Sequence, residues 1–91
     1  MKVRLYHGDP NDSSTQALGE FDSLVGARRW GIKLLKEEVA IFGYAIPYYV
    51  TDRQNNKLEQ YQASYDDTPV LTRMIYSRTN HKSIVQMLPI T

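Results

Sequence analysis

The sequence contains two histidines, His7 and His81, and a histidine is the most common base in nucleophilic catalysis. Such a base must lie within hydrogen-bond reach of a serine or threonine and must be oriented by a carboxylate. His7, Asp9 and the Ser13–Ser14 pair could be arranged in this way. However, they belong to a short polar loop that offers no walls to exclude water. We therefore expect His7 to be a polar residue at a strand end, and we predict no catalytic residue and no enzyme.

The loop after His7 also carries oxygen ligands at a spacing typical of a calcium-binding loop. Asp9, Asn11 and Ser13 alternate along it, and Glu20 stands at the last position of such a loop. The sixth position holds Ser14 instead of glycine, so a solvated hairpin loop explains the same residues. The glycines are too scattered for a phosphate-binding loop, and without cysteine no thiolate site can form. We expect no metal ion and no cofactor.

Four cations lie close together in the first half of the sequence. Arg29, Lys33 and Lys36 follow the spacing i, i+4, i+7, which places them on one exposed side of a helix, with Arg28 beside them. Such a stripe could contact nucleic-acid phosphates, or it could be an ordinary solvated face. The whole chain has a net charge of only +1. Composition therefore gives no separate reason to expect DNA or RNA as a partner.

A second candidate patch is expected on the outer face of a sheet. Tyr49 and Arg53 fall on that face together with Gln60 and Gln62 in the predicted strand pairing. Sheets that read RNA carry stacking aromatic residues on their open face. With one tyrosine at this place, the pattern favours nucleic-acid binding only weakly.

One long amphipathic helix must position the basic stripe, and the sequence predicts it from about Ser23 to Phe42. Asp22–Ser23 supplies an N-cap, and Gly43 suits the left-handed conformation that ends a helix. The apolar positions between these ends cover more than half of the helix circumference. Gly31 lies at the centre of this apolar arc, where the lack of a side chain allows close approach to a sheet.

Two charged residues interrupt the apolar arc. Arg28 falls between Leu35 and Val39, and Glu38 intrudes on the other half of the arc. A buried charge must be paired or must extend to solvent. Either the border of the arc is exposed, or these residues reach partners on the sheet or on another chain. An arc that is wider than one sheet covers is typical of a helix that binds a partner or self-associates.

Alternating apolar residues predict antiparallel strands on both sides of the helix. Lys2 to His7 and Gln16 to Phe21 form a hairpin with a long polar loop. Tyr44 to Tyr65 forms a second hairpin around an Asn55–Asn56 turn. This turn pairs Val50 with Tyr61, Tyr48 with Ala63, Ile46 with Tyr65, Tyr49 with Gln62, Thr51 with Gln60, and Arg53 with Leu58. Pro47 cannot donate to a strand ladder, which indicates an edge position or a bulge.

The last third of the sequence allows two interpretations. Thr68–Pro69 resembles a helix start, and the apolar spacing after it fits a short second helix over 69–79. Alternatively, Arg73 to Met87 folds as a hairpin around Asn80–His81, with Tyr76 opposite Val85 and Met74 opposite Met87. Thr72, Ile75, Tyr76 and Thr79 favour the strand, and we prefer the hairpin. The strand from Ser83 to Leu88 is common to both interpretations.

Together these elements predict a single α+β domain over residues 1–91. Its antiparallel sheet consists of a hairpin, one long helix and then further hairpins, with the helix packed on one face. No apolar run approaches the roughly 20 residues needed to cross a bilayer. The absence of cysteine fits a reducing compartment. We expect a cytoplasmic protein that does not contact membranes.

The start of the helix resembles a junction found in small phage and mobile-element accessory proteins. The resemblance rests on a short strand, then Phe21–Asp22–Ser23, three further residues and Ala27, and it covers Gly19 to Trp30. Some anti-CRISPR inhibitors resemble the same plan of a hairpin, one helix and more strands. The resemblance implies binding rather than catalysis and assigns no functional residue.

The sequence thus predicts a small non-enzymatic protein-binding domain that acts through surface complementarity. Its partner is another protein or a second copy in a homodimer. The alternative is a nucleic-acid-binding module that uses the basic helix stripe. The expected binding residues are Arg28, Arg29, Lys33, Lys36, Tyr49 and Arg53.

Overall fold

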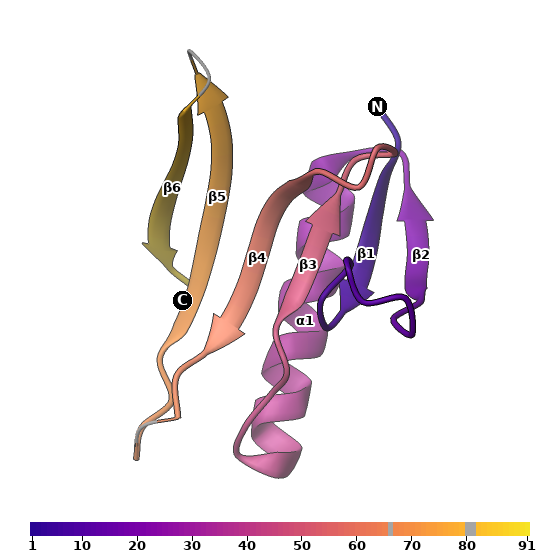
Figure 1. Cartoon of the computed structure of the whole chain (residues 1–91). Coiled ribbons are helices and arrows are strands. Elements are labelled where there is room, and N and C mark those ends of the chain that lie inside the picture. Colours follow the sequence, from indigo (N-terminus) through magenta and orange to yellow (C-terminus); the bar gives the residue numbers. More distant parts are fainter. Residues whose placement is uncertain (66, 80–81) are drawn as a thin grey trace.

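The computed structural model describes residues 1–65, 67–79 and 82–91, with the main chain alone for 78–79 and 82–84. Six antiparallel strands form one sheet in the order β2-β1-β3-β4-β5-β6, and one helix packs against it (Figure 1). The predicted α+β fold is confirmed. The elements are β1 (Val3–His7), β2 (Ala17–Phe21), α1 (Leu24–Phe42), β3 (Tyr48–Thr51), β4 (Lys57–Ala63), β5 (Leu71–Thr79) and β6 (Lys82–Pro89).

The helix begins and ends where the sequence predicts. Ser23 has an extended backbone, and its hydroxyl oxygen accepts a hydrogen bond from the Gly26 amide, at 3.1 Å. Gly43 has a positive φ of 79°, and its amide donates to the Val39 carbonyl. This combination of a serine N-cap and a left-handed glycine satisfies main-chain groups at both ends. No helix in the described part of the chain is long and apolar enough to cross a membrane.

The helix covers only part of the sheet. It packs against β1, β2, β3 and β4, whereas within the described residues no Cα atom of α1 lies within 8 Å of β5 or β6. Figure 1 shows the β5–β6 hairpin extending beyond the helix. The core lies between α1 and the first four strands. Its fully buried apolar residues include Val3, Leu5, Ala27, Leu35, Val50 and Tyr61.

The predicted register of the β3–β4 hairpin is wrong by two residues. Tyr48 lies opposite Tyr61, and Val50 lies opposite Glu59. The turn is longer than two residues because the Asp52 carboxylate accepts from the Gln54 and Asn56 amides. Side chains alternate between faces with a period of two, so this two-residue shift leaves Tyr48, Val50, Glu59 and Tyr61 on their predicted face. The register changes once more after Val50, and Thr51 lies opposite Lys57 instead of the predicted Gln60. Pro47 precedes β3, which lies inside the sheet, so it needs neither an edge strand nor a bulge.

The last third of the chain is a hairpin and not a second helix. β5 occupies 71–79, where the alternative interpretation placed the helix. Met74 pairs with Met87 and Tyr76 with Val85, as the preferred interpretation predicts. Residues 71–79 form a strand because β5 pairs with β4 as well as with β6. The β-branched and aromatic residues of β5 also fit a pleated surface. The predicted Asn80–His81 turn lies outside the described residues.

Candidate functional site

An ion-pair network joins the helix to β4 and β5. Arg28 donates two hydrogen bonds to the Glu59 carboxylate, at 2.8 and 2.7 Å. Arg73 donates two more, at 3.1 and 3.0 Å, and the Tyr61 hydroxyl donates a fifth, at 2.8 Å. Glu59 is 1 % exposed. One buried carboxylate is thus shared by two guanidinium groups, which leaves an excess of one positive charge in the network.

The network holds Glu59 in its ionised form. Burial alone would raise the pKa of the Glu59 carboxyl, but hydrogen bonds from Arg28, Arg73 and Tyr61 outweigh burial and place that pKa below its ordinary value. Burial and the hydrogen bond to Glu59 raise the pKa of the Tyr61 hydroxyl, so this hydroxyl remains a donor. The five hydrogen bonds therefore persist throughout the neutral pH range.

Both charges in the apolar arc have partners within the chain. Arg28 binds Glu59 on the sheet. Glu38 accepts from the Tyr48 hydroxyl at 2.6 Å and from the Ile46 amide at 3.2 Å. Neither residue needs a second chain for its charge to be satisfied. The excess width of the arc remains, however, because several apolar side chains of α1 stay exposed: Val25 (49 %), Trp30 (45 %), Ile41 (73 %) and Phe42 (62 %).

His7 does not form the catalytic arrangement considered from the sequence. Its Nε2 atom lies 3.0 Å from Glu38 Oε1, and its ring stacks on Tyr48 with centroids 4.4 Å apart. The Asp9 carboxylate instead accepts from the Asn11 amide within its own loop. Among the described residues, no three His, Cys, Asp or Glu side chains gather in a way that could hold a metal ion.

The tyrosine that binds Glu38 gives a first test of this packing. We expect Tyr48→Phe to lower the free energy of unfolding by about 1.5–3 kcal/mol, because it removes a hydrogen bond to a half-buried carboxylate. Urea denaturation followed by circular dichroism measures the change. Tyr49→Phe is the matched control, since the Tyr49 hydroxyl makes no hydrogen bond with the described residues. Equal losses in both variants would contradict the assignment.

Four of the predicted binding residues line one groove along α1. The groove has a volume of about 450 Å³ and is lined by Arg28, Arg29, Ile32, Lys33, Lys36 and Glu37. These residues form two parallel rows at i, i+4, i+8 spacing, and we call the space between them the basic groove. The Lys36 ammonium donates to the Thr91 carbonyl at 2.9 Å. Lys33 lies 4.8 Å from the centroid of the Trp30 ring.

The basic groove lies on the side of α1 that faces the β5–β6 hairpin. Its inner row contains Arg28, Ile32 and Lys36. Arg28 shares Glu59 with Arg73 of β5, and Lys36 binds the carbonyl of Thr91, which follows β6. Ile32 packs against the core from this side and supplies the apolar floor. The groove therefore borders the part of the sheet that the helix leaves uncovered.

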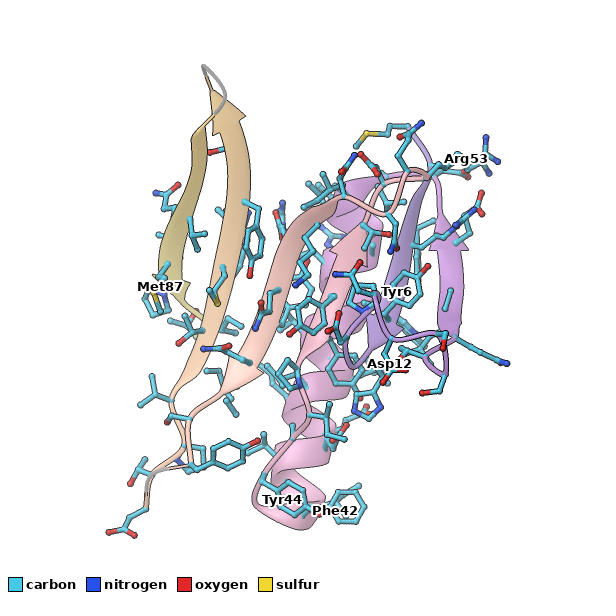
Figure 2. The ribbon with its side chains drawn as sticks, in the orientation of Figure 1. Tyr6, Asp12, Phe42, Tyr44, Arg53 and Met87 are labelled. Atoms are coloured by element: carbon cyan, nitrogen blue, oxygen red, sulfur yellow. The ribbon has the colours of Figure 1, made fainter. Side chains whose placement is uncertain are left out.

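Tyr49 and Arg53 lie apart from the basic groove. Tyr49 pairs with Gln60 in the sheet, with Lys57 at 5.0 Å from its ring centroid. Gln60 is only 8 % exposed, and it binds Gln62 and the Tyr76 hydroxyl. Arg53 lies in the β3–β4 turn, 3.6 Å from Glu20 (Figure 2). The predicted outer-face patch is therefore not an open platform for stacked bases.

Sequence reasoning did not single out Glu59 and Arg73. Glu59 could have been identified from the sequence, because the alternation of the strand places it on the inner face of β4 with Tyr61 and Ala63. A charged residue on an inner face requires a partner of opposite charge, and Arg28 presents the same problem on the helix. Arg73 had no comparable signal, because its partner depends on the register of β5.

A second exposed apolar region lies at the C-terminal end of α1. Phe42 and Tyr44 are both exposed, and their ring centroids lie 6.3 Å apart (Figure 2). Ile41 and Ile46 on either side are 73 % and 49 % exposed. Large apolar side chains that are consecutive in sequence and exposed are typical of a contact surface.

Comparison with known proteins adds no further constraint on the site. No protein-family model matches the chain, and neither a curated protein nor a solved structure matches it.

Proposed function

We propose that this chain is a non-enzymatic protein-binding domain that acts through surface complementarity. One observation carries the proposal: the basic groove combines an apolar floor with cationic rims and borders a two-stranded part of the sheet that α1 leaves uncovered. Binding surfaces typically combine a desolvated apolar centre with arginines and aromatic residues. The exposed side chains at the end of α1 extend the available contact area.

The resemblance to phage and mobile-element accessory proteins supports the same class of function. An inhibitor or accessory protein binds its target through shape and charge, so it needs neither a metal ion nor a catalytic base. A cytoplasmic location belongs to this proposal, because the sequence has no cysteine.

Affinity capture from the native host tests the proposal. Wild-type protein should retain one protein that mass spectrometry identifies. The double variant Arg29→Glu/Lys33→Glu should retain much less of it, because both side chains are exposed and line the basic groove. Recovery of the bait alone would contradict a separate protein partner. Equal recovery by both baits would place the contact outside the groove.

A nucleic-acid-binding module is the second candidate, and the clustering of four cations in one groove favours it. This function predicts retention on DNA or RNA that falls steeply with salt, since binding releases counterions from the phosphates. Reversal of the charges of Lys33 and Lys36 should abolish that retention. If the protein is not retained on DNA or RNA even at about 50 mM salt, the nucleic-acid-binding function is excluded.

A further inference from the structure

In the part of the chain that the structure describes, the sheet has six strands and one helix packs on it. Neighbouring strands lie about 4.8 Å apart and a helix is about 10 Å wide. The two strands that α1 does not contact, β5 and β6, therefore offer the width of one further helix beside α1, next to the point where Leu71 and Ile90 pack against the core. Within the described residues, this chain supplies no such helix.

The helix-side face of the hairpin is partly apolar. Glu59 points toward α1 and pairs with Ile75 in the sheet, so Ile75 lies on the same face. Arg73 pairs with Leu88, which places Leu88 there as well. Ile75 and Leu88 are neither fully buried nor fully exposed. A helix that lies on this face would remove both side chains from water.

The basic groove has the geometry that a second helix requires. Helices pack when the ridge of side chains on one enters the groove between two ridges of the other, and i±4 rows form the commonest ridges. The rows Arg28–Ile32–Lys36 and Arg29–Lys33–Glu37 are two such ridges. The eight residue steps from Arg28 to Lys36 correspond to roughly 12 Å along the axis, which is about two helical turns.

Charge determines the chemistry of the occupant. Four of the six residues that line the groove are cations and one is an acid. The rest of the chain then has seven cations and nine acids, so the positive charge is local to this groove. Arg73 adds a further guanidinium at the hairpin side, and the Glu59 carboxylate that it shares with Arg28 offsets one of these charges, so the groove and the network together remain positive.

We propose that the basic groove and the helix-side face of β5–β6 together bind an acidic amphipathic helix of a partner protein. Apolar residues on one face of that helix contact Ile32, Ile75 and Leu88, and its flanking carboxylates lie near Arg29, Lys33 and Arg73. This proposal rests on the proposed protein-binding function and names the chemistry of the partner.

Two other occupants fit the same surface less well. The α1 of a second copy would present the same cations, and like charges would then face each other across the contact. A nucleic acid would use the cations but would leave the apolar side chains of the hairpin exposed to water.

Synthetic peptides of about 14 residues, some 21 Å long as helices, test the proposal. The first carries leucine at i, i+3, i+4, i+7 with glutamate at the flanking positions. A basic twin has lysine for every glutamate, and a polar twin has serine for every leucine. Fluorescence anisotropy should show the first peptide binding at least about tenfold more tightly than the polar twin. The basic twin should not bind.

Protein variants and amide NMR shifts locate the contact. Arg29→Glu/Lys33→Glu should weaken binding of the acidic peptide by at least about tenfold, whereas Arg53→Glu, at a remote exposed turn, should leave it unchanged. Shifts should appear in residues 28–37, 71–77 and 85–88. Equal binding of the polar twin, or shifts elsewhere, would overturn the proposal.

The outcomes also separate this inference from the proposed function. Suppose that wild-type protein captures a host protein, the double variant loses it, and the acidic peptide does not bind. The protein-binding function then stands, and the acidic helix is wrong. If the wild-type protein captures no host protein and the acidic peptide does not bind, neither proposal holds. If the wild-type protein dimerises and the double variant does not, the groove binds a second copy of this chain and not the helix of a partner.

Discussion

Glu59→Gln is expected to lower the free energy of unfolding by about 3–5 kcal/mol at neutral pH, the usual cost of removing one partner from a buried ion pair. The glutamine keeps the shape of the side chain, but it leaves the Arg28 and Arg73 guanidinium groups facing an uncharged amide. Both arginine side chains are only 24 % exposed, so water replaces the lost charge incompletely. Urea denaturation followed by Trp30 fluorescence measures the loss.

Two further variants isolate the buried carboxylate as the cause. Glu20→Gln removes an exposed carboxylate whose nearest guanidinium nitrogens are 3.7 and 3.6 Å away, and it should cost less than about 1 kcal/mol. Arg73→Met leaves Glu59 paired with Arg28 alone. Its loss in the free energy of unfolding should therefore lie between those of Glu20→Gln and Glu59→Gln. If Glu59→Gln and Glu20→Gln were equally stable, the network would contribute nothing to the fold.

Lowering the pH should reduce the difference in the free energy of unfolding between the wild type and Glu59→Gln. The pKa of Glu59 is below its ordinary value of 4.5 in the folded protein, so the unfolded chain binds the proton first as the pH falls. Stability from this group is therefore complete above pH 4.5 and is lost as the pH falls through the folded pKa. Urea titrations of both proteins between pH 7 and pH 3 isolate this contribution from that of the other carboxylates. A difference that stays constant with pH would contradict the assignment.

Local chemistry made the helix and its ends predictable from the sequence. Ser23 and Gly43 act on groups within one turn of themselves, so the neighbouring residues alone determine the two caps. The same holds for the apolar arc, whose centre at Gly31 contacts the sheet as expected. These features require no knowledge of which strand lies beneath the helix.

The β3–β4 register could not be predicted from neighbouring residues alone, because two different turns fit the same alternation of apolar and polar side chains. A two-residue Asn55–Asn56 turn and the observed turn that begins at Asp52 both place Val50 and Tyr61 inside. The choice between them depends on the Asp52 carboxylate, which accepts main-chain amides at Gln54 and Asn56. The hairpin at the end of the chain was easier, since its pairs repeat over eight positions.

The candidate site was only half predictable for a related reason. The cations of the basic groove lie on one helix, so their spacing alone brings them together. Tyr49 and Arg53 depended on a predicted sheet surface, and the structure separates them from the groove. The Arg28–Glu59–Arg73 network requires the order of β4 and β5 in the sheet, which no local pattern contains.

Gly31→Val is expected to lower the free energy of unfolding by about 3 kcal/mol, because the helix approaches the sheet too closely for a side chain. A Cβ atom at this position would lie 2.8 Å from Tyr61 Cε2 and 3.1 Å from Leu5 Cδ1. Tyr61 and Leu5 are both fully buried. The hydrogen bond from the Tyr61 hydroxyl to Glu59 prevents the ring from withdrawing, so α1 itself must move.

Gly31→Ala separates this contact from helix propensity. Alanine favours an exposed helix interior by about 1 kcal/mol over glycine, yet here overpacking should exceed that gain and give a net loss of about 1–2 kcal/mol. Gly26→Ala is the matched control on the same helix, where the nearest atom to a new Cβ is Ser23 Oγ at 3.3 Å. Thermal and urea unfolding compare the two. A more stable Gly31→Ala would mean that α1 lies farther from Tyr61, and the short bonds between Arg28 and Glu59 depend on that same distance.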